Sequence, residues 1–135
     1  MTNKANSPSP LDVLKAISDH LCMNILMAIF NKVTDPDDHM QILNISYREY
    51  YSRSYRLARL GLIRRRNGEI IFTSFGLVVY HAQLKIANAF SYFLELTMID
   101  AMKSHSGMPE EEQKKIIDIM IKDCELKKLV AATKL

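Results

Sequence analysis

The chain has 135 residues, of which 48% are hydrophobic, which is enough for one packed domain with an appended helical part. Two cysteines are too few for a disulfide framework or a zinc site made of cysteines, and they are typical of the reducing cytosol. The N-terminus is polar, and charged residues interrupt the most apolar stretch, 75–102. We therefore expect no secretory signal, no transmembrane helix and a cytoplasmic protein.

The arginines are distributed unevenly along the chain. All seven lie within the 19 residues 48–66, where Glu49 is the only acid, whereas the eleven lysines lie elsewhere. The net charge of +3 conceals this cluster. A protein that needed only solubility would mix its charges over the surface. The cluster therefore predicts a surface that faces the phosphates of a nucleic acid.

Capping residues predict the helices of the N-terminal half. Residues 1–10 are rich in Ser, Asn and Pro and predict a flexible tail, at the end of which Ser9-Pro10 starts a short helix. Ser18-Asp19 offers the N-cap of a second helix, to about Asn31. Asp35-Pro36 opens a third helix, which is short because another helix start follows it closely.

Ser46 and Glu49 form the pattern of a capping box, and the helix that they start ends at Gly61. At about 100° per residue, one face of this helix holds Tyr47, Tyr50, Ser54, Leu57 and Ala58. We expect both tyrosines of this face to pack in the core. The opposite face holds Arg48, Ser52, Tyr55, Arg56 and Arg59.

Asn67-Gly68 separates two β-prone runs, which is a strong signal for a hairpin with a two-residue turn. Such a turn places Arg66 opposite Glu69 and Ile63 opposite Phe72, with Ile63 and Phe72 on the buried face. An exposed pair of Arg66 and Glu69 contributes only about 0–1 kcal/mol, so it does not explain three consecutive arginines.

Thr73 caps a predicted long helix over 74–103, which is apolar nearly all round. One face packs on its own domain, and the rest needs a partner, so we predict a dimerisation helix. A buried core helix and a ligand pocket lined by Phe90, Phe93, Met98 and Met102 are alternatives. Pro109 begins a last predicted helix, over 109–131. The sequence does not show where this helix packs. The predicted dimer interface comprises Phe75, Val79, Ile86, Phe90, Phe93 and Leu94.

The order of these elements predicts a mainly α fold with a small β-hairpin wing. It is a winged helix-turn-helix over 11–80, followed by the long C-terminal dimerisation helix. The chain resembles winged-helix regulators of the arsenical-resistance and multiple-antibiotic-resistance repressor type, including small archaeal regulators. The resemblance is carried by Ile17-Ser18-Asp19, Ile25-Leu26, Ile45-Ser46, the segment 57–64 (LARLGLIR) and Thr73-Ser74-Phe75-Gly76. It implies a DNA-binding dimer. The chain lacks the cysteine pair of the metal-sensing members, which argues against thiol-based metal sensing.

We therefore expect a sequence-selective, double-stranded-DNA-binding transcription regulator that is a homodimer and associates with the nucleoid. The helix 46–60 would enter the major groove, and the wing 62–73 would lie on the backbone or the minor groove. The sequence shows no catalytic constellation, metal site or cofactor motif, and it does not reveal whether an effector exists. The predicted DNA contacts are Arg48, Tyr51, Ser52, Arg53, Tyr55, Arg56, Arg59, Arg64, Arg65 and Arg66.

Three other interpretations stay open. The chain is alternatively a winged-helix protein-interaction module of a transcription complex, or a non-specific chromatin architectural protein. Four of the six tyrosines lie within residues 47–55, which also permits an aromatic stacking surface for single strands. We favour the last interpretation least, because these side chains lie on a helix rather than on an open sheet.

Overall fold

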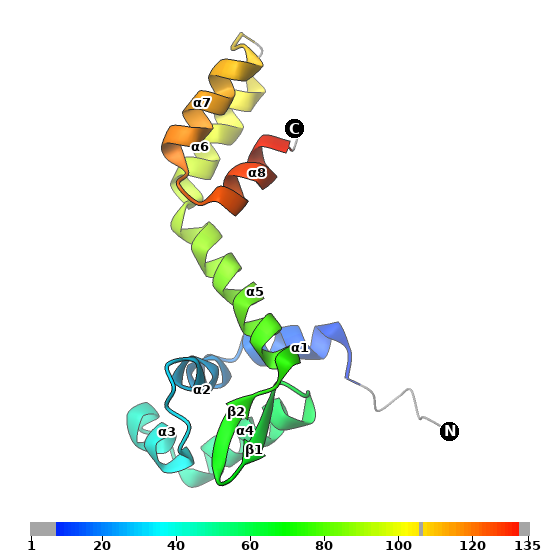
Figure 1. Ribbon diagram of the computed structural model, residues 1–135, viewed down its shortest axis with the longest axis vertical. Helices are drawn as coiled ribbons and strands as arrows, with labels where there is room; N and C mark the ends of the chain where they lie inside the picture. The colour runs from blue at the N-terminus through cyan, green and yellow to red at the C-terminus, as the bar shows by residue number, and fades with distance from the viewer. Residues whose placement is uncertain (1–7, 106, 133–135) are drawn as a thin grey trace, which may run out of the picture. The chain divides into compact units, whose positions relative to one another are not determined.

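The computed structural model describes residues 8–105 and 107–132, which are mainly helical with one two-stranded antiparallel sheet (Figure 1). They form two compact units, Met1–Gln83 and Leu84–Leu135, which we describe separately. Most of the tail predicted over residues 1–10 lies outside the described residues. The first unit contains α1 (Pro10–Ile17), α2 (His20–Phe30), α3 (Pro36–Leu43), α4 (Tyr47–Arg59), β1 (Ile63–Arg66), β2 (Glu69–Phe72) and the first half of α5 (Ser74–Ser91).

Side-chain caps confirm the predicted helix starts of the first unit. The Asp19 carboxylate caps α2 by accepting from the Leu21 N–H at 3.0 Å. The Ser46 hydroxyl caps α4 by accepting from the Glu49 N–H at 3.2 Å, which is one half of the predicted capping box. The complete, reciprocal box is formed at the start of α1 by Ser9 and Asp12, and these hydrogen bonds hold the pKa of Asp12 below its usual value.

Left-handed residues connect these elements. Asn44 ends α3 at φ 51°, and Gly61 follows α4 at φ 80°. Asn67 and Gly68 both have positive φ, as a type I′ turn requires, and the register pairs Arg66 with Glu69. The predicted register of the hairpin is therefore confirmed, including the pair of Ile63 with Phe72.

Helix α2 is the centre of the first unit, because it contacts α1, α3, α4 and β2. Its buried face is apolar and meets Tyr50 and Leu57 of α4 in the core. The prediction for Tyr50 is confirmed, but the prediction that Tyr47 packs in the core is wrong, since Tyr47 is 68% exposed. Tyr47 is the first residue of α4, and its ring lies on that of Tyr51 with centroids 4.2 Å apart.

A buried hydrogen bond joins α3 to α4. His39 is fully buried, and its Nδ1 lies 2.7 Å from the Tyr50 hydroxyl. The Nε2 atom of His39 faces the carbonyl oxygen of Val33, to which only a ring N–H can donate. In the neutral ring Nδ1 then carries no proton and accepts from the Tyr50 hydroxyl, and burial raises the pKa of that tyrosine.

Gly76 lets the start of α5 pass directly over Leu62, in the segment that joins α4 to β1. A Cβ atom at this position would lie 1.8 Å from the Leu62 carbonyl oxygen, so only glycine fits without a backbone shift. Thr73 fixes the same junction, since its hydroxyl donates to the Gly61 carbonyl and accepts from the Gly76 N–H at 2.9 Å. The predicted cap at Thr73 is therefore confirmed.

The prediction of a single helix over 74–103 is wrong, because the helix is interrupted at Tyr92, which separates α5 from α6 (Phe93–Ser104). The Ser91 hydroxyl donates to the Asn88 carbonyl at 2.5 Å, and the Tyr92 N–H bonds to Ala89 instead. A side chain that hydrogen-bonds to a backbone carbonyl oxygen of its own helix bends the helix at that point.

The helix predicted over 109–131 also consists of two, α7 (Glu110–Met120) and α8 (Cys124–Ala132). Ile121 is extended and fully buried, and Asp123 caps α8 by accepting from the Leu126 N–H. This bond holds the pKa of Asp123 below its usual value. The break turns α8 back onto the core of the second unit, which consists of Ile99, Ile117 and Ile121 with Tyr92, Leu96, Met102, Met120, Leu126 and Val130 around them.

Across the described residues, no helix is by itself both long and apolar enough to cross a membrane, although α1 and α2, bent by 85°, meet these criteria as a pair.

Replacing Tyr50 with Phe is expected to lower the free energy of unfolding by about 1–3 kcal/mol, because it leaves the buried Nδ1 of His39 without a donor. Urea denaturation followed by circular dichroism measures this. Tyr47→Phe removes the same hydroxyl from an exposed ring and should change the value by less than about 0.5 kcal/mol. Equal effects of the two substitutions would contradict the assigned hydrogen bond.

Candidate nucleic-acid interface

Helix α4 presents three sides besides its buried stripe of Tyr50, Ser54 and Leu57. An outer ridge carries the exposed residues Arg48, Ser52, Tyr55 and Arg59. A second side faces the hairpin, and a third side faces the start of α2. The division follows from helical spacing, since a stripe at i, i+4 and i+7 leaves the rest of the surface to solvent or to neighbours.

The hairpin brings three exposed arginines next to α4. Arg65 shares the core-facing side of the hairpin with Ile63 and Ile70, and its guanidinium lies 5.3 Å from the centroid of the Tyr51 ring. The Tyr47 ring packs against the same ring at an interplanar angle of 38°, so Tyr47, Tyr51 and Arg65 are linked by consecutive contacts. These contacts tie the tip of the hairpin to the first turns of α4.

Between α4 and the hairpin lies an open hollow of about 410 Å³. Its floor is formed by small and apolar side chains of both elements, while tyrosines and arginines form its walls. None of the residues that line it is acidic. The lining residues are Tyr47, Tyr51, Ser54, Tyr55, Ala58, Ile63, Arg64, Arg65 and Ile70.

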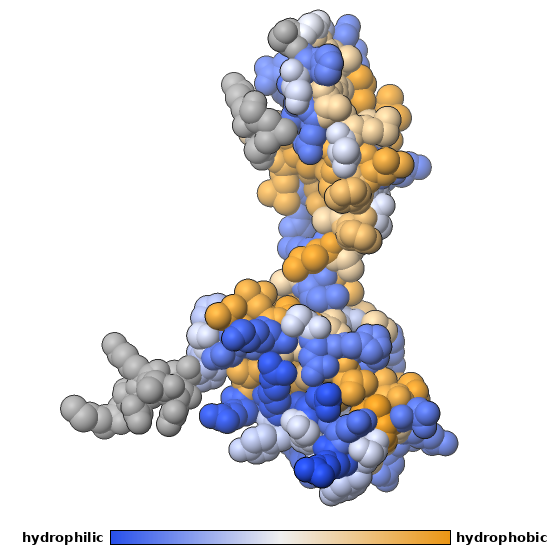
Figure 2. All heavy atoms as spheres, turned by 180° about the vertical axis from the view of Figure 1, so that it is seen from behind, coloured by the Kyte–Doolittle hydropathy of each residue, from blue (hydrophilic) through white to orange (hydrophobic). Residues whose placement is uncertain are grey.

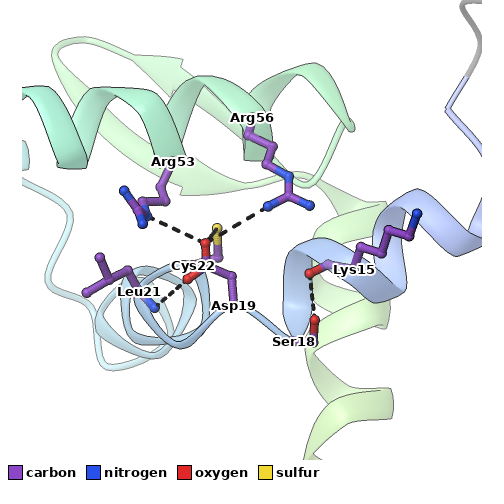
Figure 3. Close-up of polar contacts among 7 residues, drawn as sticks. All are labelled: Lys15, Ser18, Asp19, Leu21, Cys22, Arg53 and Arg56. Carbon is purple, nitrogen blue, oxygen red and sulfur yellow. Dashed lines mark hydrogen bonds and ion pairs between the residues drawn. The ribbon is translucent and has the colours of Figure 1, made fainter.

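The positive charge on the third side of α4 is partly neutralised by Asp19, the residue that caps α2 (Figure 3). The Asp19 carboxylate lies 3.5 Å from Nε of Arg53 and 3.9 Å from a terminal nitrogen of Arg56. Arg53 is partly covered, and its Nε atom is buried. A single carboxylate therefore holds two of the ten predicted DNA contacts toward α2.

Cys22 lies beside this ion cluster, with its thiol sulfur 3.7 Å from the Asp19 carboxylate. Burial and the negative charge of Asp19 raise the pKa of Cys22 to about 11. At neutral pH the thiol is therefore protonated and weakly reactive, and it is fully buried in the core. Within residues 8–105 and 107–132, no group of three or more His, Cys, Asp or Glu side chains is placed to hold a metal.

The predicted contact residues thus separate into groups. Tyr51, Tyr55, Arg64 and Arg65 line one hollow, and the outer ridge adds Arg48, Ser52 and Arg59. Arg66 is exposed near the tip of the hairpin, whereas Arg53 and Arg56 face Asp19. Sequence reasoning missed Asp19 and Tyr47. The capping role of Asp19 was visible, but its pairing with α4 depends on tertiary packing.

The predicted dimer residues are mostly exposed and apolar. In the first unit Phe75 is exposed and Val79 is half-buried. In the second unit Phe90 is 76% exposed, and Ile86, Phe93 and Leu94 are exposed as well. Figure 2 shows hydrophobic side chains gathered over this unit. The alternative pocket is not assembled, because Met102 packs on the core of the second unit while Phe90, Phe93 and Met98 face outward.

Comparison with known proteins gives no match: no family model, no curated protein and no solved structure is significantly similar to the chain.

Proposed function

We propose that the chain is a sequence-selective DNA-binding transcription regulator of the winged helix-turn-helix type, acting as a homodimer. In this proposal α4 enters the major groove, and the hairpin is the wing that lies on the backbone or in the minor groove. The observation that carries the proposal is the arrangement of exposed arginines. Arg48 and Arg59 on the outer ridge of α4 stand beside Arg64, Arg65 and Arg66 of the adjoining hairpin.

The proposal assigns different tasks to these side chains. Arg48, Ser52 and Tyr55 face the base edges or the flanking phosphates, because the first turns of a recognition helix lie deepest in the groove. Arg59 and the hairpin arginines hold the backbone, which gives affinity without sequence preference. Arg53 and Arg56 take part only to the extent that phosphate displaces Asp19 from them.

Homodimer formation rests on the exposed apolar face of the second unit. The surface of this unit exposes five large apolar side chains, Ile86, Phe90, Phe93, Leu94 and Met98. Monomeric soluble proteins rarely expose large apolar patches. A two-fold dimer would place two copies of α4 in successive major grooves, about 34 Å apart. The dimer therefore makes DNA binding bivalent.

The DNA-binding prediction is tested by titrating the protein against its own upstream region and a random duplex of about 30 base pairs, at several salt concentrations. If each protomer of a dimer neutralises about four phosphates, the log–log salt slope is near −7. Replacing Arg64, Arg65 and Arg66 with Gln should weaken binding by at least about a hundredfold and make the slope markedly shallower.

The matched control replaces Lys114, Lys115 and Lys122, three exposed lysines of the second unit, with Gln. It removes the same charge and should change the affinity by less than about threefold. Equal losses from both triple variants would show attraction to total charge only. Absence of binding at low salt would favour the protein-interaction module, and equal affinity for both duplexes would favour the architectural protein.

Replacing Asp19 with Asn should raise duplex affinity by about two- to tenfold and steepen the salt slope by up to about 1 per protomer. The substitution frees Arg53 and Arg56 from their carboxylate but keeps the cap of α2, because Asn caps as well as Asp. The same titration measures the effect. An unchanged affinity and slope would place both arginines outside the DNA contact.

The dimer is tested by light scattering after size exclusion, which should give twice the chain mass of 15.5 kDa. Phe90→Glu should shift the protein toward the monomer, since a buried unpaired carboxylate costs several kcal/mol. Ile42→Glu places the same charge on an exposed apolar position of α3 and should leave the mass unchanged. A monomeric parent chain would contradict the proposed dimer.

A further inference from the structure

The hollow between α4 and the hairpin combines exposed aromatic rings with positive charge. Contact with a DNA duplex does not require these two features together. Tyr47 and Tyr55 are exposed aromatic side chains on its wall, and Arg64 and Arg65 bring positive charge to the opposite wall. Ring faces bind a nucleobase by stacking, and guanidinium groups bind a phosphate. The lining contains no acidic residue, so its charged side chains are all positive.

We propose that this hollow binds one unpaired nucleotide, with the base stacked on the tyrosine wall and the phosphate on Arg65. A tyrosine cluster on a helix alone offers no enclosed surface for a base. Here the hairpin supplies a second wall, and the contacts of Tyr51 with Tyr47 and Arg65 link this wall to α4. The volume of about 410 Å³ lies within the range of about 300–1,000 Å³ that is usual for ligand sites.

Each part of the hollow has a separate role. Ile63, Ile70 and Ala58 make an apolar floor, which favours a flat base over bulk water. Arg65 is already oriented by its contact with Tyr51, so little side-chain entropy is lost when it meets a phosphate. Hydroxyl groups of the tyrosines supply hydrogen bonds without selecting one base, so we expect weak preference among bases.

The test uses adenosine monophosphate, with adenosine and ribose 5-phosphate as matched probes that lack the phosphate or the base. Isothermal calorimetry should give saturable binding of adenosine monophosphate, and each truncated probe should bind at least about tenfold more weakly. A 5′-phosphorylated thymidine hexamer is titrated in parallel. It distinguishes a free nucleotide from an unpaired nucleotide in a strand, and binding of either source by base and phosphate together supports the proposal.

Two variants separate the two contacts. Tyr47→Ala should weaken nucleotide binding by about five- to a hundredfold through loss of stacking. Tyr47 is not among the proposed duplex contacts and reaches Arg65 only through Tyr51, so Tyr47→Ala should weaken duplex binding much less than nucleotide binding. Arg65→Gln should weaken nucleotide binding by about tenfold or more through loss of charge. Arg59→Gln removes one exposed arginine of α4 outside the hollow and should leave nucleotide binding unchanged. Circular dichroism verifies that each variant is folded.

Three outcomes would overturn the proposal. One is the absence of saturable binding of either nucleotide or hexamer up to about 10 mM. Another is equal binding of adenosine monophosphate and ribose 5-phosphate, which would show phosphate attraction without stacking. The third is equal loss from Arg59→Gln and Arg65→Gln, which would place the ligand elsewhere. None of these outcomes depends on duplex binding, so this proposal and the proposed function can fail separately.

Discussion

Tyr50, Ser54 and Leu57 pack one narrow stripe of α4 into the core of the first unit. Burial of this stripe fixes the rotation of α4, and the rotation decides what every other side chain of the helix can contact. His39 of α3 also holds this stripe, because its buried ring accepts a hydrogen bond from the Tyr50 hydroxyl. A rotated α4 would have to break this bond and bury charged groups, both of which are costly. The exposed ridge and the hollow therefore have well-defined positions.

Part of the positive charge on α4 is cancelled by a neighbouring carboxylate. Asp19 caps α2 and pairs with Arg53 and Arg56, so one carboxylate links the start of α2 to one side of α4. Partly exposed ion pairs with separations of 3.5 and 3.9 Å contribute little to stability. Their larger effect is on the surface potential, because they cancel part of the positive charge on that side of α4. The positive surface that remains lies on the ridge, which adjoins the side that faces Asp19, and on the hairpin, which lies on the opposite side of α4 from Asp19.

Local signals predicted most of the first unit correctly, and the reasons are physical. N-caps, a proline at the first helical position and the Asn-Gly turn act on backbone groups a few residues away, so sequence shows them. The register of the hairpin followed from the turn alone. Tyr47 was misplaced because a position on the edge of the buried face can be stacked on a neighbouring ring instead of being covered. Its place in a hollow depended on where the hairpin folds.

The second unit was predicted less well, because its helix breaks are decided by single hydrogen bonds inside long apolar segments. Ser91 and Asp123 each supply such a bond, and both residues are also tolerated within helices. The breaks matter for function, since they let α6, α7 and α8 form a core of their own around Ile99 and Ile117. A unit with its own core can leave Phe90 and its neighbours exposed without loss of stability. The exposed apolar residues around Phe90 thus belong to one unit and the arginine cluster to the other, so each set can be substituted without changing a residue of the other.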